Sequence, residues 1–289
     1  MDVFLPATLE EALETAAAHP EVVPIAGGTD VMVELNMDLG RPETLLDVSR
    51  LPELLEIRRE NGSAFVGAGV TYTRLMRELP ELTALVQASR SVGSPQIRNR
   101  GTIGGNLGTA SPAGDALPVL AAWDAEVVLA TAGGSTRSMR WDAFLTGVKR
   151  NALGSGELIL GVRWDVPTGP GSFSKIGTRN AMVIAVASLC LQVDEDSRSI
   201  RVALGSVAQT VVRASDAETL VAQTFQDAGI WDDPNADLDA EAIEALGAAV
   251  AEAASPIDDV RGTAAYRRHA VAVMARRALS WAIADRRAD

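Results

Sequence analysis

The sequence predicts an α+β protein built from two domains. At 289 residues the chain is longer than one ordinary small domain and fits two compact ones. Strand and helix patterns alternate through the N-terminal part, whereas the C-terminal part has consecutive strands followed by helices. Between the two parts, Thr168-Gly169-Pro170-Gly171 is typical of a domain boundary. We therefore expect an N-terminal domain of residues 1–167 and a smaller sheet-plus-helices domain of residues 172–289.

The N-terminal domain is expected to mix strands and helices. Thr8 and Glu11 have the spacing of a capping box, which predicts a helix that ends near His19. Asn61-Gly62 suits the positive φ angles of a two-residue turn, so residues 54–69 are expected to form a hairpin. Periodicity predicts the other elements, with strands at 21–25, 44–47, 126–130 and 157–166 and helices at 31–39, 71–76, 80–90 and 116–123.

Residues 93–115, GSPQIRNRGTIGGNLGTASPAGD, differ in character from the rest of this domain. They are rich in Gly, Ser, Thr and Asn and contain almost no bulky apolar residues. This composition predicts a long loop, and loops of such length inside a compact domain are usually functional or disordered.

The C-terminal domain is expected to combine a meander of strands with two or three closing helices. Apolar runs predict strands at 173–175, 184–193 and 200–208, and periodicity predicts helices at about 239–253 and 263–286. The basic residues between Tyr266 and Arg277 are typical of a solvated helix face.

Composition limits the classes of function. A hydrophobic content of 47% with 22% charged residues is ordinary for a folded globular protein. The formal net charge of −12 argues against nucleic-acid binding, because phosphates would be repelled. No apolar run reaches the roughly 20 residues of a membrane-spanning helix, and the first residues do not resemble a signal peptide. We expect a cytoplasmic protein.

The few cysteines and histidines restrict metal chemistry. The only cysteine, Cys190, lies in an apolar run typical of a buried strand, and one thiol can form neither an intramolecular disulfide nor an iron–sulfur cluster. His19 and His269 are expected at the surface or at a helix end, so no metal site is predicted. The tryptophans, including Trp123 and Trp281, are expected to be packing anchors. Any redox chemistry here therefore requires an organic cofactor.

Two glycine-rich segments carry the strongest functional signal. In Ile25-Ala26-Gly27-Gly28-Thr29-Asp30, paired glycines stand between a predicted strand and a predicted helix. Glycine lets backbone N–H groups converge on an anion, since no Cβ blocks the approach, and the following helix adds positive potential. Taken alone, this segment is weak evidence for a phosphate site, because a tight strand–helix connection that binds nothing has the same pattern.

The second segment, Gly101-Thr102-Ile103-Gly104-Gly105-Asn106, repeats this chemistry and adds hydrogen-bonding side chains. A pyrophosphate has enough charged oxygens for two such segments, and nearby Ser111 and Asp115 could bond sugar hydroxyls. The pair of segments therefore indicates dinucleotide binding. Arg98 and Arg100 flank the second segment and contact phosphates or a partner protein, or else simply lie at the surface.

A nicotinamide site of the Rossmann type is excluded by its spacing. Gly67-Ala68-Gly69 follows a strand, but Tyr72 stands where a third small residue is required. No acidic residue lies at the distance needed to bind the ribose. Gly67 and Gly69 are interpreted as packing residues at a strand end.

The runs AGGTD (26–30) and QIRNRGTIGGNLGTASPAGD (96–115) resemble the signature of FAD-binding subunits in the xanthine dehydrogenase and carbon monoxide dehydrogenase family of molybdenum hydroxylases. The resemblance continues in Gly156–Leu160, Lys175–Arg179 and Asp259–Arg268, so it covers nearly the whole chain in order. Thr29-Asp30 is more similar to the xanthine dehydrogenase branch.

This resemblance implies a two-subdomain FAD-binding domain of the p-cresol methylhydroxylase (PCMH) and vanillyl-alcohol oxidase type, with FAD between the subdomains and a separate C-terminal domain after it. It also implies the cofactor-binding residues by position. The diphosphate would be held by Ile25, Ala26, Gly27, Gly28, Thr29, Asp30 and Val31 and faced by Gly101, Thr102, Gly104, Gly105 and Asn106. The ribose and neighbouring groups would be held by Thr109, Ser111 and Asp115, with Ile159 against the flavin or adenine and Lys175 close to FAD.

The implied function is electron transfer through non-covalent FAD, without a catalytic side chain for substrate chemistry in this chain. A large partner would hold the molybdenum cofactor, a small partner would hold [2Fe-2S] clusters, and the complex would be a dimer of heterotrimers. The external acceptor would be NAD or another oxidant. Two alternatives stay open, a self-sufficient flavin oxidase of the same fold group and a scaffold that has lost FAD. The substrate is not indicated, because its specificity would reside in the molybdenum subunit.

Overall fold

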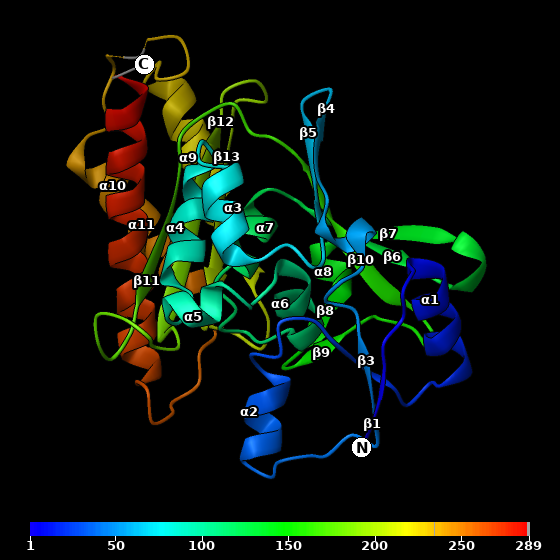
Figure 1. Ribbon diagram of the computed structural model, residues 1–289. Helices are drawn as coiled ribbons and strands as arrows, with labels where there is room; N and C mark the ends of the chain where they lie inside the picture. Colours follow the sequence, from blue (N-terminus) through cyan, green and yellow to red (C-terminus); the bar gives the residue numbers. More distant parts are fainter. Residues whose placement is uncertain (234, 288–289) are drawn as a thin grey trace. The chain divides into compact units, whose positions relative to one another are not determined.

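Two groups of elements make up the computed structural model, which describes residues 1–233 and 235–287 (Figure 1). Unit 1 contains residues 1–78, 94–111 and 124–165, and unit 2 contains residues 79–93, 112–123 and those from 166 onward. The grouping therefore does not follow a single cut in the sequence. The expected domains 1–167 and 172–289 remain a prediction, and residues 288–289 of the second lie outside the described residues.

Unit 1 contains two main sheets. The parallel sheet has the order β1 (Asp2–Phe4), β3 (Thr44–Asp47), β2 (Val23–Ile25). The antiparallel sheet has the order β4 (Ile57–Glu60), β5 (Ser63–Gly67), β10 (Leu158–Asp165), β6 (Glu126–Ala130), β7 (Thr136–Arg140), and a short pair is formed by β8 (Leu145–Gly147) and β9 (Arg150–Asn151). The β4–β5 hairpin stands out as a two-stranded ribbon in Figure 1.

The helices of unit 1 are short and follow local sequence signals. They are α1 (Leu9–Ala18), α2 (Val31–Asn36), α3 (Tyr72–Glu78), α5 (Pro95–Arg98), α6 (Ile103–Thr109) and α8 (Trp141–Phe144), with 3-10 turns η1 (Pro52–Leu55) and η2 (Ala132–Gly134). The capping box at the first helix is confirmed, since Thr8 Oγ1 accepts a hydrogen bond from the Glu11 N–H at 3.2 Å. The predicted hairpin is confirmed as well, with φ angles of 52° at Asn61 and 82° at Gly62.

The predicted long loop at residues 93–115 is wrong as stated, because α5 and α6 lie within it. Ser94 caps α5 through its hydroxyl, and Thr102 caps α6 by accepting from the Gly105 N–H at 3.0 Å. Ile103 and Leu107 of α6 are fully buried. The two caps and the two buried apolar side chains therefore stabilise helices in a segment whose glycines have low helix propensity.

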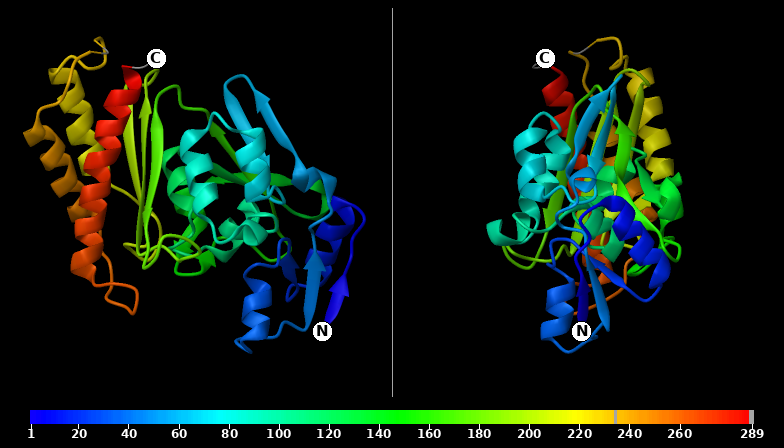
Figure 2. Two further views of the ribbon diagram at one scale, coloured as in Figure 1. Left: turned by 60° about the vertical axis from the view of Figure 1, so that its left-hand side comes forward. Right: turned by 45° about the vertical axis from the view of Figure 1, so that its right-hand side comes forward.

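Unit 2 is a four-stranded antiparallel sheet with helices on both faces (Figure 2). The strand order is β11 (Gly171–Ile176), β12 (Ala187–Asp194), β13 (Ser199–Gly205), β14 (Val212–Arg213). One face packs against α9 (Ser215–Asp227) and α11 (Ala264–Arg286), on which α10 (Ala240–Ala253) packs in turn, and the other face packs against α4 (Thr83–Ser91) and α7 (Leu117–Ala122). The predicted strands and the last two helices are present, whereas α9 and β14 were not given ranges from the sequence.

Side-chain alternation along β12 separates the two faces of this sheet. Leu189, Leu191 and Val193 join the core beneath α9–α11. Gln192 belongs to the opposite face, where its Oε1 accepts a hydrogen bond from Trp123 Nε1 at 3.0 Å. Both faces of the strand are therefore buried, which explains its almost continuously apolar sequence.

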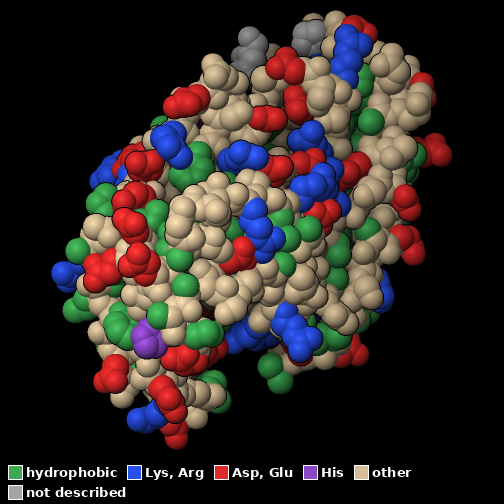
Figure 3. Space-filling model, turned by 90° about the vertical axis from the view of Figure 1, so that its right-hand side faces the viewer, with side chains coloured by type: hydrophobic (Ala, Val, Ile, Leu, Met, Phe, Trp, Pro, Cys, Tyr) green, Lys and Arg blue, Asp and Glu red, His purple; other side chains and the backbone are tan. Residues whose placement is uncertain are grey.

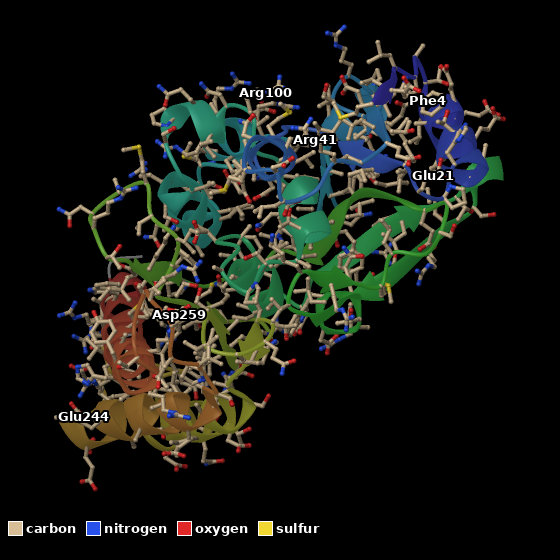
Figure 4. The ribbon with its side chains drawn as sticks, turned by 90° about the horizontal axis from the view of Figure 1, so that it is seen from below. Phe4, Glu21, Arg41, Arg100, Glu244 and Asp259 are labelled. Atoms are coloured by element: carbon tan, nitrogen blue, oxygen red, sulfur yellow. The ribbon has the colours of Figure 1, made fainter. Side chains whose placement is uncertain are left out.

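The basic start of α11 is not a uniformly solvated face, and this expectation needs correction. Arg267 is only 4% exposed and donates hydrogen bonds to the carbonyl oxygens of Val186 at 2.8 Å and Ser206 at 2.7 Å. It also pairs with Asp259, labelled in Figure 4, at 2.6 Å. Trp281 is likewise 48% exposed rather than a packing anchor, whereas Trp123 is buried as expected.

The described residues contain neither a membrane-spanning helix nor a cluster of metal-ligating side chains. None of their helices has the length and apolar character required to cross a bilayer. In the same residues no cluster of three or more His, Cys, Asp or Glu side chains is arranged to hold a metal ion. On the face shown in Figure 3, acidic and basic side chains both occur among apolar ones.

Candidate functional site

The two glycine-rich segments lie against each other in unit 1. A Cβ added at Gly27 would fall 1.9 Å from the carbonyl oxygen of Arg100, so the two backbones are in direct contact and only glycine fits. A Cβ added at Gly101 would lie 3.5 Å from Thr29 Oγ1. Thr109 Oγ1 also donates a hydrogen bond to Asp30 at 3.1 Å. Residues that are far apart in the sequence therefore form one local surface, as the paired motifs predict.

The first segment presents a run of available backbone donors. It leaves β2 at Ile25 and enters α2 at Val31, and Gly28 turns the chain with a φ of +73°. The N–H groups of residues 27–31 donate no hydrogen bond to any described residue, although the Gly28 and Asp30 carbonyls accept from α2. Consecutive N–H groups around a left-handed residue form a concavity that binds anions.

The second segment does not repeat this arrangement, which corrects the expectation of two equivalent loops. The Gly101 N–H donates to Ile97 O at 2.6 Å, the Gly104 N–H to Ala68 O at 2.9 Å, and the Gly105 N–H to Thr102 Oγ1 at 3.0 Å. The physical reason is that residues 103–109 form a capped helix whose first N–H groups are already satisfied. Within residues 101–106 the Thr102 N–H alone donates to no described residue, so the segment would contact a ligand chiefly through side chains and Cα surfaces.

The exposed side of α6 lacks side chains at two positions one turn apart. Gly105 and Gly108 are both exposed, and a Cβ added at Gly108 would lie 3.8 Å from Cδ1 of Ile159. Asn106 Oδ1, on the same helix, is buried and has no hydrogen-bond partner among the described residues. An orphaned buried acceptor beside a bare helix face is consistent with a bound ligand that supplies the missing donor.

Asp115 and Lys175, which were predicted for the same site, both belong to unit 2 and contact each other. Lys175 Nζ lies 2.7 Å from Asp115 Oδ2 and donates to Ser91 O at 3.1 Å. The side chains are 9% and 7% exposed, and burial raises the pKa of Asp115 while Lys175 opposes that shift. Ser111 ends a segment of unit 1, directly after Ala110 in the left-handed conformation.

Two residues near this surface were missed by sequence reasoning. Gly108 supplies the second bare position on α6, and Asn151 Nδ2 donates to its carbonyl oxygen at 2.8 Å. Gly108 could have been found only if the segment had been predicted as a helix, since the three-residue spacing from Gly105 has no meaning in a loop. Asn151 lies in β9, and no local signal in the sequence links it to α6.

Comparison with known families identifies the kind of protein that carries this surface. Residues 1–168, more than half of the chain, match the family described as the FAD binding domain in molybdopterin dehydrogenase. The chain belongs to this family. Residues 234–282 match the carbon monoxide dehydrogenase flavoprotein C-terminal domain. The resemblance drawn from the glycine-rich runs is thereby confirmed.

Individual relatives agree with this assignment. The nicotinate dehydrogenase FAD-subunit of Eubacterium barkeri is 38% identical over 206 residues, which cover 67% of this chain and 69% of the relative. The xanthine dehydrogenase FAD-binding subunit of Escherichia coli is 29% identical over 290 residues, covering 96% and 94%. These relatives are subunits of dehydrogenases, so the chain is of the oxidoreductase-subunit type.

A solved structure supports the fold. Carbon monoxide dehydrogenase from Hydrogenophaga pseudoflava, in a form that lacks the Mo-pyranopterin moiety of its molybdenum cofactor, contains a chain with a TM-score of 0.86 and 26% identity. The match covers 99% of this chain and 98% of that chain. The predicted fold class, an FAD-binding domain followed by a C-terminal domain in an α+β protein, is confirmed.

The residues of unit 1 fit the cofactor of this family. FAD has a diphosphate that needs several donors, and the N–H groups of residues 27–31 are available for it. The unsatisfied Asn106 amide can serve a polar group of the same ligand. The side-chain-free face at Gly105 and Gly108 leaves space next to Ile159 for a flat or extended group.

Proposed function

We propose that this chain binds one FAD non-covalently and acts as the electron-transfer subunit of a molybdenum-containing hydroxylase. The observation that carries the proposal is the direct packing of the two family glycine segments, with available N–H donors on one and an unsatisfied Asn106 on the other. FAD, when bound, accepts electrons singly and releases them as a pair, which suits an exit site toward an external acceptor such as NAD.

The proposed binding residues divide by the group they would hold. Residues 27–31 would donate to the diphosphate, and Ile25 and Ala26 would bring the end of β2 to it. The remaining residues proposed from the family pattern are Gly101, Thr102, Gly104, Gly105, Asn106, Thr109, Ser111, Asp115, Ile159 and Lys175. In this set Gly104 would act by letting α6 approach Ala68, and Thr109 would act by orienting Asp30 of the first segment through its hydroxyl.

The proposed partners follow from what one chain with one cysteine can hold. A [2Fe-2S] cluster needs about four thiolate ligands. Electrons must therefore reach this subunit from clusters in a small partner, which in turn serves a large partner with the molybdenum cofactor. The relative from Hydrogenophaga pseudoflava, 28% identical over 270 residues, is a carbon monoxide dehydrogenase medium chain, which supports a subunit role for this chain. We propose a cytoplasmic dimer of such heterotrimers.

Stopped-flow absorbance in the flavin bands tests this function. The full chain loaded with FAD should be reduced by dithionite but not by purines, aldehydes or N-heterocycles. A substrate of the complex should bleach the flavin only after the molybdenum and iron–sulfur subunits are added. Rapid bleaching of the lone chain by one of these substrates would instead establish a self-sufficient oxidase. A wild-type chain without affinity for FAD would leave only the scaffold alternative.

A further inference from the structure

Arg100 holds a guanidinium group beside the available donors of the first glycine segment. It stands on the connection between α5 and α6 and is labelled in Figure 4. Its Nε donates a long hydrogen bond of 3.4 Å to the Gly27 carbonyl oxygen. Its carbonyl oxygen is the atom that a Cβ at Gly27 would strike, so backbone and side chain of Arg100 both contact the same glycine. Arg100 is thus held against the first segment.

The remaining donors of this guanidinium have no partner among the described residues. Only Nε has a hydrogen bond, and no carboxylate in the described part of the chain forms an ion pair with Arg100. Other basic side chains near α2 are already paired, because Lys149 contacts Glu34 at 2.8 Å and Arg41 contacts Asp38 at 2.9 Å. A planar fork with free N–H groups is well suited to phosphate oxygens.

Charge balance also calls for a cation at this place. The first segment supplies neutral N–H groups and one carboxylate, Asp30, which is exposed and oriented by Thr109. A diphosphate brings two negative charges, and a nearby carboxylate would repel them. Backbone N–H dipoles supply only partial positive charges. The guanidinium of Arg100 carries a full positive charge that no carboxylate of the described residues neutralises, so it adds attraction for the diphosphate.

We propose that Arg100 is a further diphosphate-binding residue, which clamps the pyrophosphate of FAD against residues 27–31. This inference rests on the proposed function and extends it, because it assigns the charge recognition to a residue outside the glycine motifs. The second glycine segment then has a different task. The bare Cα of Gly27 lets the backbone of Arg100 approach, and Gly101 lies next to Thr29, while the run of available N–H donors belongs to the first segment.

The test compares flavins with and without the diphosphate on the full chain. Arg100→Met should weaken FAD binding by about tenfold, the lower end of the range for charge-assisted hydrogen bonds, because the site is exposed. Riboflavin, which has the same ring system and no phosphate, should bind both proteins equally. Arg100→Lys keeps the charge without the planar guanidinium, so its FAD affinity should lie between those of the wild type and Arg100→Met. Arg41→Met, an exposed and already paired arginine near α2, is the matched control and should bind FAD as the wild type does.

Dissociation constants from flavin fluorescence, measured at two salt concentrations, decide between the outcomes. The proposal is supported if Arg100→Met loses affinity for FAD but not for riboflavin, and if its FAD affinity depends less on salt than that of the wild type. Equal FAD affinity in the wild type and Arg100→Met overturns the proposal. An equal loss of affinity for FAD and for riboflavin also overturns it, because Arg100 would then only hold the two segments in contact. If Arg100→Met does not fold, the same comparison applies to Arg100→Lys. Failure of the wild type to bind FAD would refute the proposed function itself, a result distinct from either.

Discussion

Gly104→Ala isolates the contact that fixes α6 against the strand end of β5. A Cβ at this position would lie 2.4 Å from the Cβ of Ala68 and 2.6 Å from its carbonyl oxygen, which are atoms that cannot rotate away. Overpacking of this kind costs about 1–3 kcal/mol, while replacing a helical glycine by alanine returns up to about 1 kcal/mol. We expect a net loss of about 1–2 kcal/mol in the free energy of unfolding. FAD affinity should fall as well, because α6 must move and carries Asn106 with it.

Gly108→Ala is the matched control for this prediction. It makes the same chemical change in the same helix, but its Cβ meets only Cδ1 of Ile159 at an ordinary 3.8 Å. We expect this variant to be as stable as the wild type or more stable by up to about 1 kcal/mol. Urea unfolding of the flavin-free proteins measures both changes. The reasoning is refuted if Gly104→Ala is no less stable than Gly108→Ala.

Three further results are expected. Acid precipitation should release FAD into the supernatant, since neither histidine lies in a glycine-rich segment; flavin that stays with the pellet would indicate a covalent bond. Lys175→Met leaves Asp115 buried without its cation and should destabilise the chain by about 3–5 kcal/mol at neutral pH. Because burial raises the pKa of Asp115, its folded state binds the proton more tightly than its unfolded state does. The stability of Lys175→Met should therefore decline as pH rises through the folded pKa and recover below the ordinary pKa. Urea unfolding at several pH values across this range measures the change, and a loss that does not depend on pH contradicts the prediction. Cys190 is fully buried with a raised thiol pKa, so a thiol reagent should label it only in denaturant, and rapid labelling of the native chain would show that β12 is accessible.

Local signals in the sequence were sufficient for elements whose geometry is decided within a few residues. The Asn61-Gly62 turn and the Thr8 cap both form as predicted, because a positive φ and a hydroxyl acceptor are properties of the residues themselves. The same holds for the paired glycine segments. Gly27 and Gly101 were selected by pattern, and the structure places them in direct contact with the opposite segment.

Features that depend on distant residues were not predictable in this way. The glycines of α6 argue for a loop, and the helix forms because Ile103 and Leu107 are buried by neighbours from elsewhere in the chain. Arg267 was expected in solvent because its neighbours are charged, yet three acceptors from other segments bring it into the interior. The partner of Lys175 was equally hidden, since nothing in the sequence near it points to Asp115.

The position of β10 in its sheet has a consequence for biosynthesis. β5 and β6 do not pair with each other, and each is joined to the sheet through β10, where Arg163 faces both Phe65 and Glu126. A ribosome-bound chain that has not yet extended past Asp165 therefore carries two hairpins with open edges and no strand between them. Chaperone binding should concentrate in this interval of synthesis, and fragments truncated before residue 158 should aggregate.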